Sequence, residues 1–196
     1  FKQKTAYEIP LRLVGSEMCI RDRYRMPDVD LLKERLTTVE KFDDSDFTWG
    51  DLCKIERDSY NISDFFDILI KPLGMLSGDL GVKFSAKILN PWLNKYSRGG
   101  FQEIHYHDDC DIAGVVFLND GEDFSKFYFW DAHHTSFTKP WIKILTQMKL
   151  SNIYYPEVKA GDVLLFPSHM LHGVSPHNCD IIRETFSFNV VVTNVE

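Results

Sequence analysis

The sequence has no apolar run of the roughly 18 residues that a membrane-spanning helix needs, so we expect no membrane partner. It also has no low-complexity tract and no cluster of Lys and Arg of the kind that binds a nucleic-acid backbone. The 196 residues carry a formal net charge of −7. An acidic surface argues further against nucleic acid as a partner.

Cysteine is scarce, with 4 in the chain, and one of these, Cys19, lies in an unusual leading segment. The others, Cys53, Cys110 and Cys179, lack the paired spacing of a secreted disulfide framework. We therefore expect a reducing, intracellular location and a cytoplasmic protein.

The leading segment, residues 1–23, reads FKQKTAYEIPLRLVGSEMCIRDR and resembles the in-frame translation of an adapter used in short-read sequencing libraries. We interpret it as an artefact and exclude it from fold reasoning, which means that the true N-terminus is missing. Five of the 22 basic and three of the 29 acidic residues lie in it, so without it the net charge becomes −9 instead of −7. The remainder, 24–196, suits a single domain.

The domain divides into a helical part and a strand-rich part. In 24–80, apolar residues recur at three- and four-residue steps, as in Val29, Leu32 and Leu36, and Ser63 is a plausible N-cap for a second helix. From residue 81 the pattern predicts short strands over 82–90, 92–96, 101–107, 112–118, 126–130, 153–158, 163–167 and 181–193.

Many short strands without alternating helices predict a mainly β protein. We expect a double-stranded β-helix, or jelly roll, over 81–196, with N-terminal helices packed on one sheet. An insert, 131–152, interrupts the strands, contains a predicted short helix over 140–145, and could cover the mouth of the barrel as a lid.

The last predicted strand has two contrasting faces. Arg183, Thr185, Ser187 and Asn189 alternate with apolar residues such as Phe186 and Phe188. We expect the polar row to line a cavity inside the barrel, while the phenylalanines pack under the helices.

All 7 histidines lie between His105 and His177. His105 and His107 are two residues apart, so on a strand both rings point to the same side, as a chelating pair must. His172, expected in a turn after the strand that ends at Pro167, supplies a third candidate ligand. Three ligands leave metal positions open, which favours catalysis over a structural role.

An ordered series of motifs carries a resemblance to a known family. The series runs Tyr96-x-x-Gly99, His105-x-His107, 114-GVVFLN-119, 161-GDVLLFP-167, His172 and Arg183. It covers roughly residues 92–192 and resembles the 2-oxoglutarate- and iron(II)-dependent oxygenases related to prolyl hydroxylases.

The resemblance implies a function and a site. It implies a dioxygenase that uses Fe(II), 2-oxoglutarate and O2, with ascorbate as a stimulant, and that hydroxylates an unidentified small molecule or peptide with release of succinate and CO2. His105 and His172 would bind the iron, and Arg183, with Thr185 on the same face, would bind the far carboxylate of 2-oxoglutarate. The family has an acid where this chain has His107, so the second ligand is either His107 or, in a shifted pair, Asp109.

Arg183 has an alternative interpretation, an internal salt bridge, because a buried guanidinium needs a carboxylate.

A cupin-like metal protein, an isomerase or a sugar-binding module, is the alternative function, since Gly99-x5-His105-x-His107-x3-Asp111 resembles a cupin motif. A domain that binds without turnover also remains open. His133, His134, His169, His177 and Cys110 are expected outside the ligand set.

Overall fold

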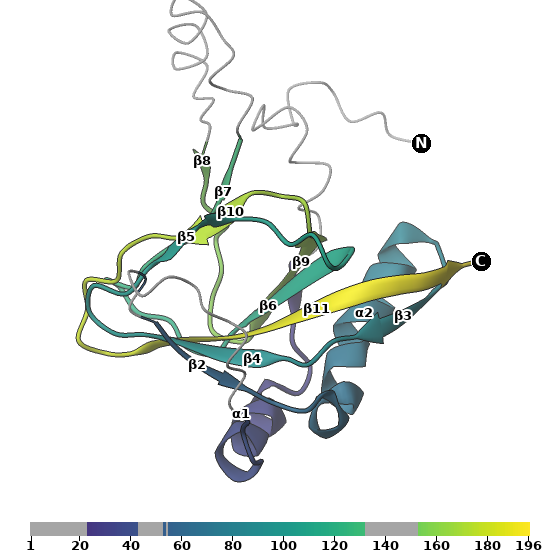
Figure 1. Ribbon diagram of the computed structural model, residues 1–196, viewed down its shortest axis with the longest axis horizontal. Coiled ribbons are helices and arrows are strands. Elements are labelled where there is room, and N and C mark those ends of the chain that lie inside the picture. Colours follow the sequence, from purple (N-terminus) through teal and green to yellow (C-terminus); the bar gives the residue numbers. More distant parts are fainter. Residues whose placement is uncertain (1–22, 43–52, 54, 132–152) are drawn as a thin grey trace, which may run out of the picture.

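The computed structural model describes residues 23–42, 53, 55–131 and 153–196, which form two antiparallel sheets and two helices (Figure 1). In the seven-stranded sheet the order is β1, β9, β6, β11, β4, β2, and β3 pairs with the far half of β11. Its strands are β1 (Arg23–Arg25), β2 (Ile55–Ser59), β3 (Phe84–Ile88), β4 (Trp92–Tyr96), β6 (Ile112–Phe117), β9 (Asp162–Pro167) and β11 (Arg183–Val195).

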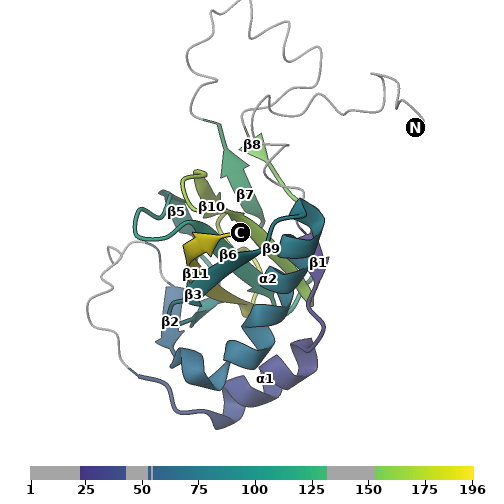
Figure 2. The same cartoon turned by 90° about the vertical axis from the view of Figure 1, so that its right-hand side faces the viewer.

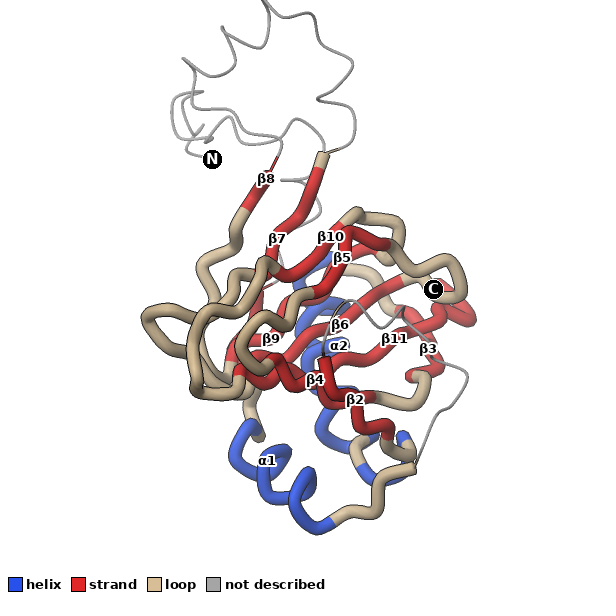
Figure 3. Tube along the Cα trace, turned by 60° about the vertical axis from the view of Figure 1, so that its left-hand side comes forward, coloured by secondary structure: helices blue, strands red, loops and turns tan. Residues whose placement is uncertain are grey.

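The second sheet has four strands in the order β5, β10, β7, β8 and lies over the larger one (Figure 3). Its strands are β5 (Gln102–His105), β7 (Phe127–Trp130), β8 (Ile153–Tyr154) and β10 (His172–Val174). Apolar side chains such as Phe117, Phe127 and Phe166 pack between the two sheets. The predicted mainly β fold, a double-stranded β-helix, is confirmed.

Two helices, α1 (Val29–Thr38) and α2 (Phe66–Leu80), cover the outer face of the larger sheet (Figure 2). A short 3-10 turn, Ile62–Asp64, precedes α2. At the end of α2, Gly81 adopts a left-handed conformation with φ 65°, which closes the helix because glycine has no Cβ to clash there. The helices bury their apolar faces against the sheet.

Strand β11 separates two kinds of interior. Phe186, Phe188 and Val190 are fully buried and pack with apolar residues of α1 and α2. The alternate residues, from Arg183 to Asn189, are also buried but line a cavity between the two sheets. The predicted split of this strand into an apolar and a polar face is confirmed.

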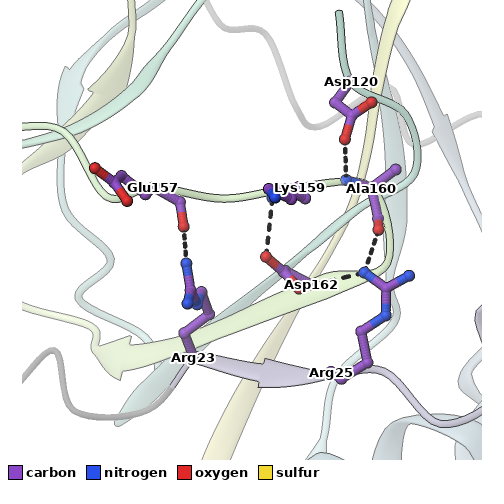
Figure 4. Close-up of polar contacts among 7 residues, drawn as sticks. All are labelled: Arg23, Arg25, Asp120, Glu157, Lys159, Ala160 and Asp162. Carbon is purple, nitrogen blue, oxygen red and sulfur yellow. Dashed lines mark hydrogen bonds and ion pairs between the residues drawn. The ribbon is translucent and has the colours of Figure 1, made fainter.

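Strand β1 begins at the last residue of the segment 1–23 and adds an edge to the larger sheet. Arg23 pairs with Leu164 in register, and residues 1–22 lie outside the described residues. Figure 4 shows how β1 is attached to the turn before β9: the Arg23 guanidinium donates to the Glu157 carbonyl and Arg25 donates to that of Ala160. The amide of Ala160 in turn donates to Asp120 at 2.8 Å.

Three features differ from the sequence-based expectation or fall outside the structure. The part 24–80, expected to be helical, also contains β1 and β2. The expectation that His172 lies in a turn is wrong, because it is the first residue of strand β10. The insert lies outside the described residues except for Asp131, and so do His133, His134 and the helix predicted over 140–145.

A glycine in β6 is required by the packing on β11. Gly114 pairs with Phe188, and a Cβ built on Gly114 would lie 2.3 Å from the Phe188 ring. The ring is fully buried and has no room to move aside. Gly114→Ala should therefore lower the free energy of unfolding by about 1–3 kcal/mol, measured by urea denaturation.

Gly74 in α2 provides the matched control, because nothing lies within 4 Å of the position that a Cβ would take on it. Gly74→Ala should raise the free energy of unfolding by about 0.5–1 kcal/mol, since alanine is the better helix former. A Gly114→Ala protein as stable as the wild type would contradict the packing described above.

Candidate metal centre

Three histidines meet at the junction of β5 and β10. His105 ends β5 and pairs in register with His172, which begins β10, while His107 lies two residues beyond the end of β5. The backbone amide of His107 donates to the Ser168 carbonyl at 2.9 Å, which holds this residue beside the other two. One ring nitrogen from each histidine lies within 4.8 Å of the others.

Hydrogen bonds fix the tautomer of all three rings. The Nδ1 atom of His105 lies 2.7 Å from the Glu103 carbonyl oxygen, and that of His172 lies 2.8 Å from the Met170 carbonyl oxygen. A carbonyl only accepts, so each Nδ1 carries the proton and donates it. The Nδ1 of His107 makes the equivalent bond to Asn189 Oδ1 at 2.8 Å. Nε2 is therefore the unprotonated nitrogen in each ring, the form in which imidazole binds a metal.

The surroundings also keep the rings neutral. Burial lowers the pKa of His105 to about 4 and that of His172 well below its usual value. Burial lowers the pKa of His107 as well, against the opposing effect of the Asn189 hydrogen bond. Neutral imidazoles need no deprotonation before they bind a metal.

The structure brings His107, and not Asp109, into the group with His105 and His172. Asp109 lines a neighbouring cavity together with Trp92 and Asn189. Within the described residues, the three histidines form the only cluster of potential metal ligands, and it contains no carboxylate. A facial set of three imidazoles suits iron, zinc or copper and leaves other positions on the metal open.

Arg183 lies in the same cavity as the three histidines. The residue is 3 % exposed, and its guanidinium carbon lies 4.8 Å from the centre of the Tyr96 ring and 5.7 Å from that of Phe117. None of the ion pairs among the described residues includes Arg183, and its Nη1 has no hydrogen-bond partner there. The internal salt bridge considered from the sequence is therefore not formed within the described part of the chain.

Other polar side chains complete the cavity. Thr185 and Tyr96 are buried beside Arg183, and burial raises the pKa of the Tyr96 hydroxyl. Asn94 donates to Ser187 Oγ at 3.1 Å. This bond holds the two side chains together on the polar face of the cavity.

Sequence reasoning missed Gln102, which also lines the cavity and is 5 % exposed. Strict alternation would place it on the face opposite His105, three residues away. An irregularity in the pairing of β5 with β10 overrides this, because His172 pairs with His105 but Val174 pairs with Gln102. No signal in the sequence marks this bulge.

His177 is fully buried and has a structural role. Its Nδ1 accepts the backbone amide of Ser125 at 3.1 Å, and its Nε2 therefore donates to the Ile181 carbonyl at 2.8 Å. The backbone of His177 also exchanges hydrogen bonds with Gly99 and Gly100. One residue thus joins the segments that precede β5, β7 and β11.

Two further candidates, His169 and Cys110, take no part in the cluster of ligands. His169 is exposed. Burial raises the pKa of the Cys110 thiol to about 11, which disfavours the thiolate, the nucleophilic form.

A double-stranded β-helix that holds neutral imidazoles and a buried arginine in one cavity matches the architecture of the jelly-roll metal-dependent oxygenases. The family model described as "Putative 2OG-Fe(II) oxygenase" matches residues 90–189, just over half of the chain. The chain belongs to this family of 2-oxoglutarate- and iron(II)-dependent oxygenases.

Solved structures with the same fold include several oxygenases. HygX from Streptomyces hygroscopicus, with nickel and 2-oxoglutarate bound, has a TM-score of 0.59 and 15% identity, over 87% of this chain and 80% of that one. A Pseudomonas putida prolyl-4-hydroxylase has a TM-score of 0.57 and 13% identity, over 88% and 92% respectively. A search of curated proteins found no match. Among the described residues, no helix is long and apolar enough to cross a membrane.

Substitution of the candidate ligands should separate His107 from Asp109. His107→Ala should weaken Fe(II) or Ni(II) binding by more than about 100-fold. Loss of a residue that only hydrogen-bonds a metal ligand costs up to about 100-fold, and loss of the ligand itself should cost more. Asp109→Ala should bind metal as the wild type does, because the carboxylate lies outside the cluster. Metal content after dialysis, measured by mass spectrometry, checks both variants, and metal loss in Asp109→Ala alone would contradict the three-histidine set.

Stability of the metal-free protein should depend on pH through the same rings. His105 has a pKa of about 4 when folded and 6.5 ordinarily, so the unfolded chain binds its proton more readily. The contribution of His105 to the free energy of unfolding is therefore complete above about pH 6.5 and is lost as the pH falls towards 4. His105→Gln should flatten this fall, measured by urea unfolding between about pH 6.5 and 5. A His105→Gln protein with the same slope as the wild type would contradict the expectation.

Proposed function

We propose that this protein is a dioxygenase that couples oxidation of 2-oxoglutarate to hydroxylation of a C–H bond in a small molecule or a peptide. The reaction takes 2-oxoglutarate, O2 and R–H, and gives succinate, CO2 and R–OH. Bound Fe(II) and 2-oxoglutarate would together supply the activation of O2.

The observation that carries the proposal is the buried Arg183 in the cavity of the three histidines. A guanidinium without a carboxylate partner in a dry cavity costs several kcal/mol, unless a ligand supplies the negative charge. The rings of Tyr96 and Phe117 lie against this group, and its Nη1 has no partner among the described residues. A carboxylate that accepts its N–H groups would satisfy both the charge and the donors.

The residues present fit both groups that the family implies. Three neutral imidazoles with Nε2 unprotonated suit a divalent cation and leave coordination positions for other ligands. A dicarboxylate between the metal and Arg183 would place a negative charge near each positive one. In this arrangement His105, His107 and His172 hold the metal and Arg183 with Thr185 holds the far carboxylate.

The remaining residues position these groups and exclude water. Asn189 fixes the His107 ring through its Nδ1 hydrogen bond, and the carbonyls of Glu103 and Met170 do the same for the other two. Apolar side chains, including Phe127, Phe166 and Val174, also line the cavity. A cavity of this kind protects a reactive centre from bulk solvent.

The cupin-like alternative receives less support from the same geometry. Its motif assigns a metal-binding acid to Asp111, but Oδ2 of Asp111 accepts the backbone amide of Val192 at 2.8 Å. Asp111 is also absent from the histidine cluster in the described part of the chain. A cupin has no need for a buried arginine in the cavity, whereas an oxygenase that uses a keto acid does.

Replacement of Arg183 tests the proposal directly. Arg183→Met should weaken 2-oxoglutarate binding at least about 30-fold, the loss expected when one partner of a buried charged pair is removed. Metal content should be unchanged, because Arg183 is not among the candidate ligands. Calorimetric titration of the Ni(II)-loaded protein without O2 measures the affinity.

Wild-type protein with Fe(II), ascorbate and O2 should form succinate from 2-oxoglutarate, at least slowly, even without a primary substrate. Mass spectrometry of the products detects it, and the Arg183→Met variant is the control. Failure of the wild-type protein to bind or consume 2-oxoglutarate would refute the proposed function.

A further inference from the structure

Gln102 has a buried amide with no partner in the described structure. The residue is 5 % exposed, and its Nε2 has no hydrogen-bond partner there. It lines the same cavity as Arg183, whose Nη1 is also buried without a hydrogen-bond partner among the described residues. Buried donors without partners are rare in folded proteins, so two of them in one cavity indicate an acceptor-rich ligand.

The strand register places Gln102 at the Arg183 end of the cavity. Along β11, Asn189 bonds His107 near the metal site, and Arg183 lies six residues away, paired with Tyr96 of β4. The chain turns after Tyr96 and enters β5 at Gln102, three residues before His105. Three residues of strand correspond to about 10 Å, so Gln102 and Arg183 both lie away from the metal and towards the same end.

We propose that the Gln102 amide is a second donor to the far carboxylate of the keto acid, acting beside Arg183 and selecting for a dicarboxylate. This inference rests on the proposed use of 2-oxoglutarate. A carboxylate has two oxygens and about four acceptor sites, so it can accept from a guanidinium and an amide at once. Hydrogen bonds to a charged acceptor are stronger than those between neutral groups.

The amide also explains why a polar residue occupies this position. A methionine or leucine would fit an apolar wall beside Val174 and Phe127 without leaving a buried donor unsatisfied. Replacement of Gln102 by an apolar residue should therefore leave the metal-free protein as stable as before, or make it more stable. If the melting temperature of such a variant matches that of the wild type, a loss of ligand binding does not come from a damaged fold.

The test compares two keto acids and two variants. The first keto acid is 2-oxoglutarate, and the second is 2-oxopentanoate, which has a methyl group in place of the far carboxylate. Both are titrated calorimetrically into Ni(II)-loaded protein without O2. Gln102→Met should weaken 2-oxoglutarate binding about tenfold, as expected for one hydrogen bond to a charged group, and leave 2-oxopentanoate binding unchanged. The melting temperature and the Ni(II) content of Gln102→Met should match or exceed those of the wild type.

Gln102→Glu keeps the shape of the side chain but replaces the donor with a negative charge. Its carboxylate would repel the far carboxylate and compete for Arg183, so 2-oxoglutarate binding should fall further than in Gln102→Met. This comparison does not depend on the affinity for 2-oxopentanoate.

Three outcomes would overturn the inference. Equal weakening of both keto acids in Gln102→Met would place the amide at the metal-binding end of the ligand. Unchanged binding of 2-oxoglutarate would mean that a water satisfies the amide, and a Gln102→Glu protein that binds as well as Gln102→Met would exclude contact with a carboxylate. Wild-type protein that binds no 2-oxoglutarate would instead refute the proposed function itself.

Discussion

The register of β11 against β4 and β6 determines which side chains face the candidate metal site. Thr185, for example, pairs with Asn94 of β4 on one side and with Phe117 of β6 on the other. A shift of one residue would turn Phe186 and Phe188 into the cavity and bury Arg183 under the helices. Burial of the phenylalanines against α1 and α2 therefore holds the polar row in place, and the stability of the core and the geometry of the site depend on the same pairing.

The charge balance of the site follows from its three neutral candidate ligands. A divalent metal and Arg183 would together bring three positive charges into a cavity where the described ligand cluster contains no carboxylate. A set of two histidines and one carboxylate would offset one of these charges, but His107 does not. A bound 2-oxoglutarate dianion would offset two of these charges, while Arg57 adds a further guanidinium to the lining of the cavity.

The sequence was informative where a regular pattern coincides with one element. The alternation in β11 needed only the period of a strand, and the mainly β fold followed from the many short strands. His107 lies beyond the end of β5, so its place beside His105 depends on the hydrogen bond to Ser168 and not on strand period alone. Strand β10 has three residues, one of them Gly173, which is too few for any period to be recognised, so His172 was expected in a turn. The inward position of Gln102 depends on a bulge between two strands distant in the sequence, and the partners of each Nδ1 depend on tertiary structure. Local patterns contain none of this information.

His177 fixes the distance between the backbone segments that lead into β5 and β11. Its hydrogen bonds reach Gly99 and Gly100 just before β5, and Ile181 just before β11. Gln102 and Arg183 therefore begin their strands from points that are joined through one buried residue. The separation between their backbones is therefore set by the fold, and under the proposed function this separation limits the length of an acceptable keto acid before any ligand arrives.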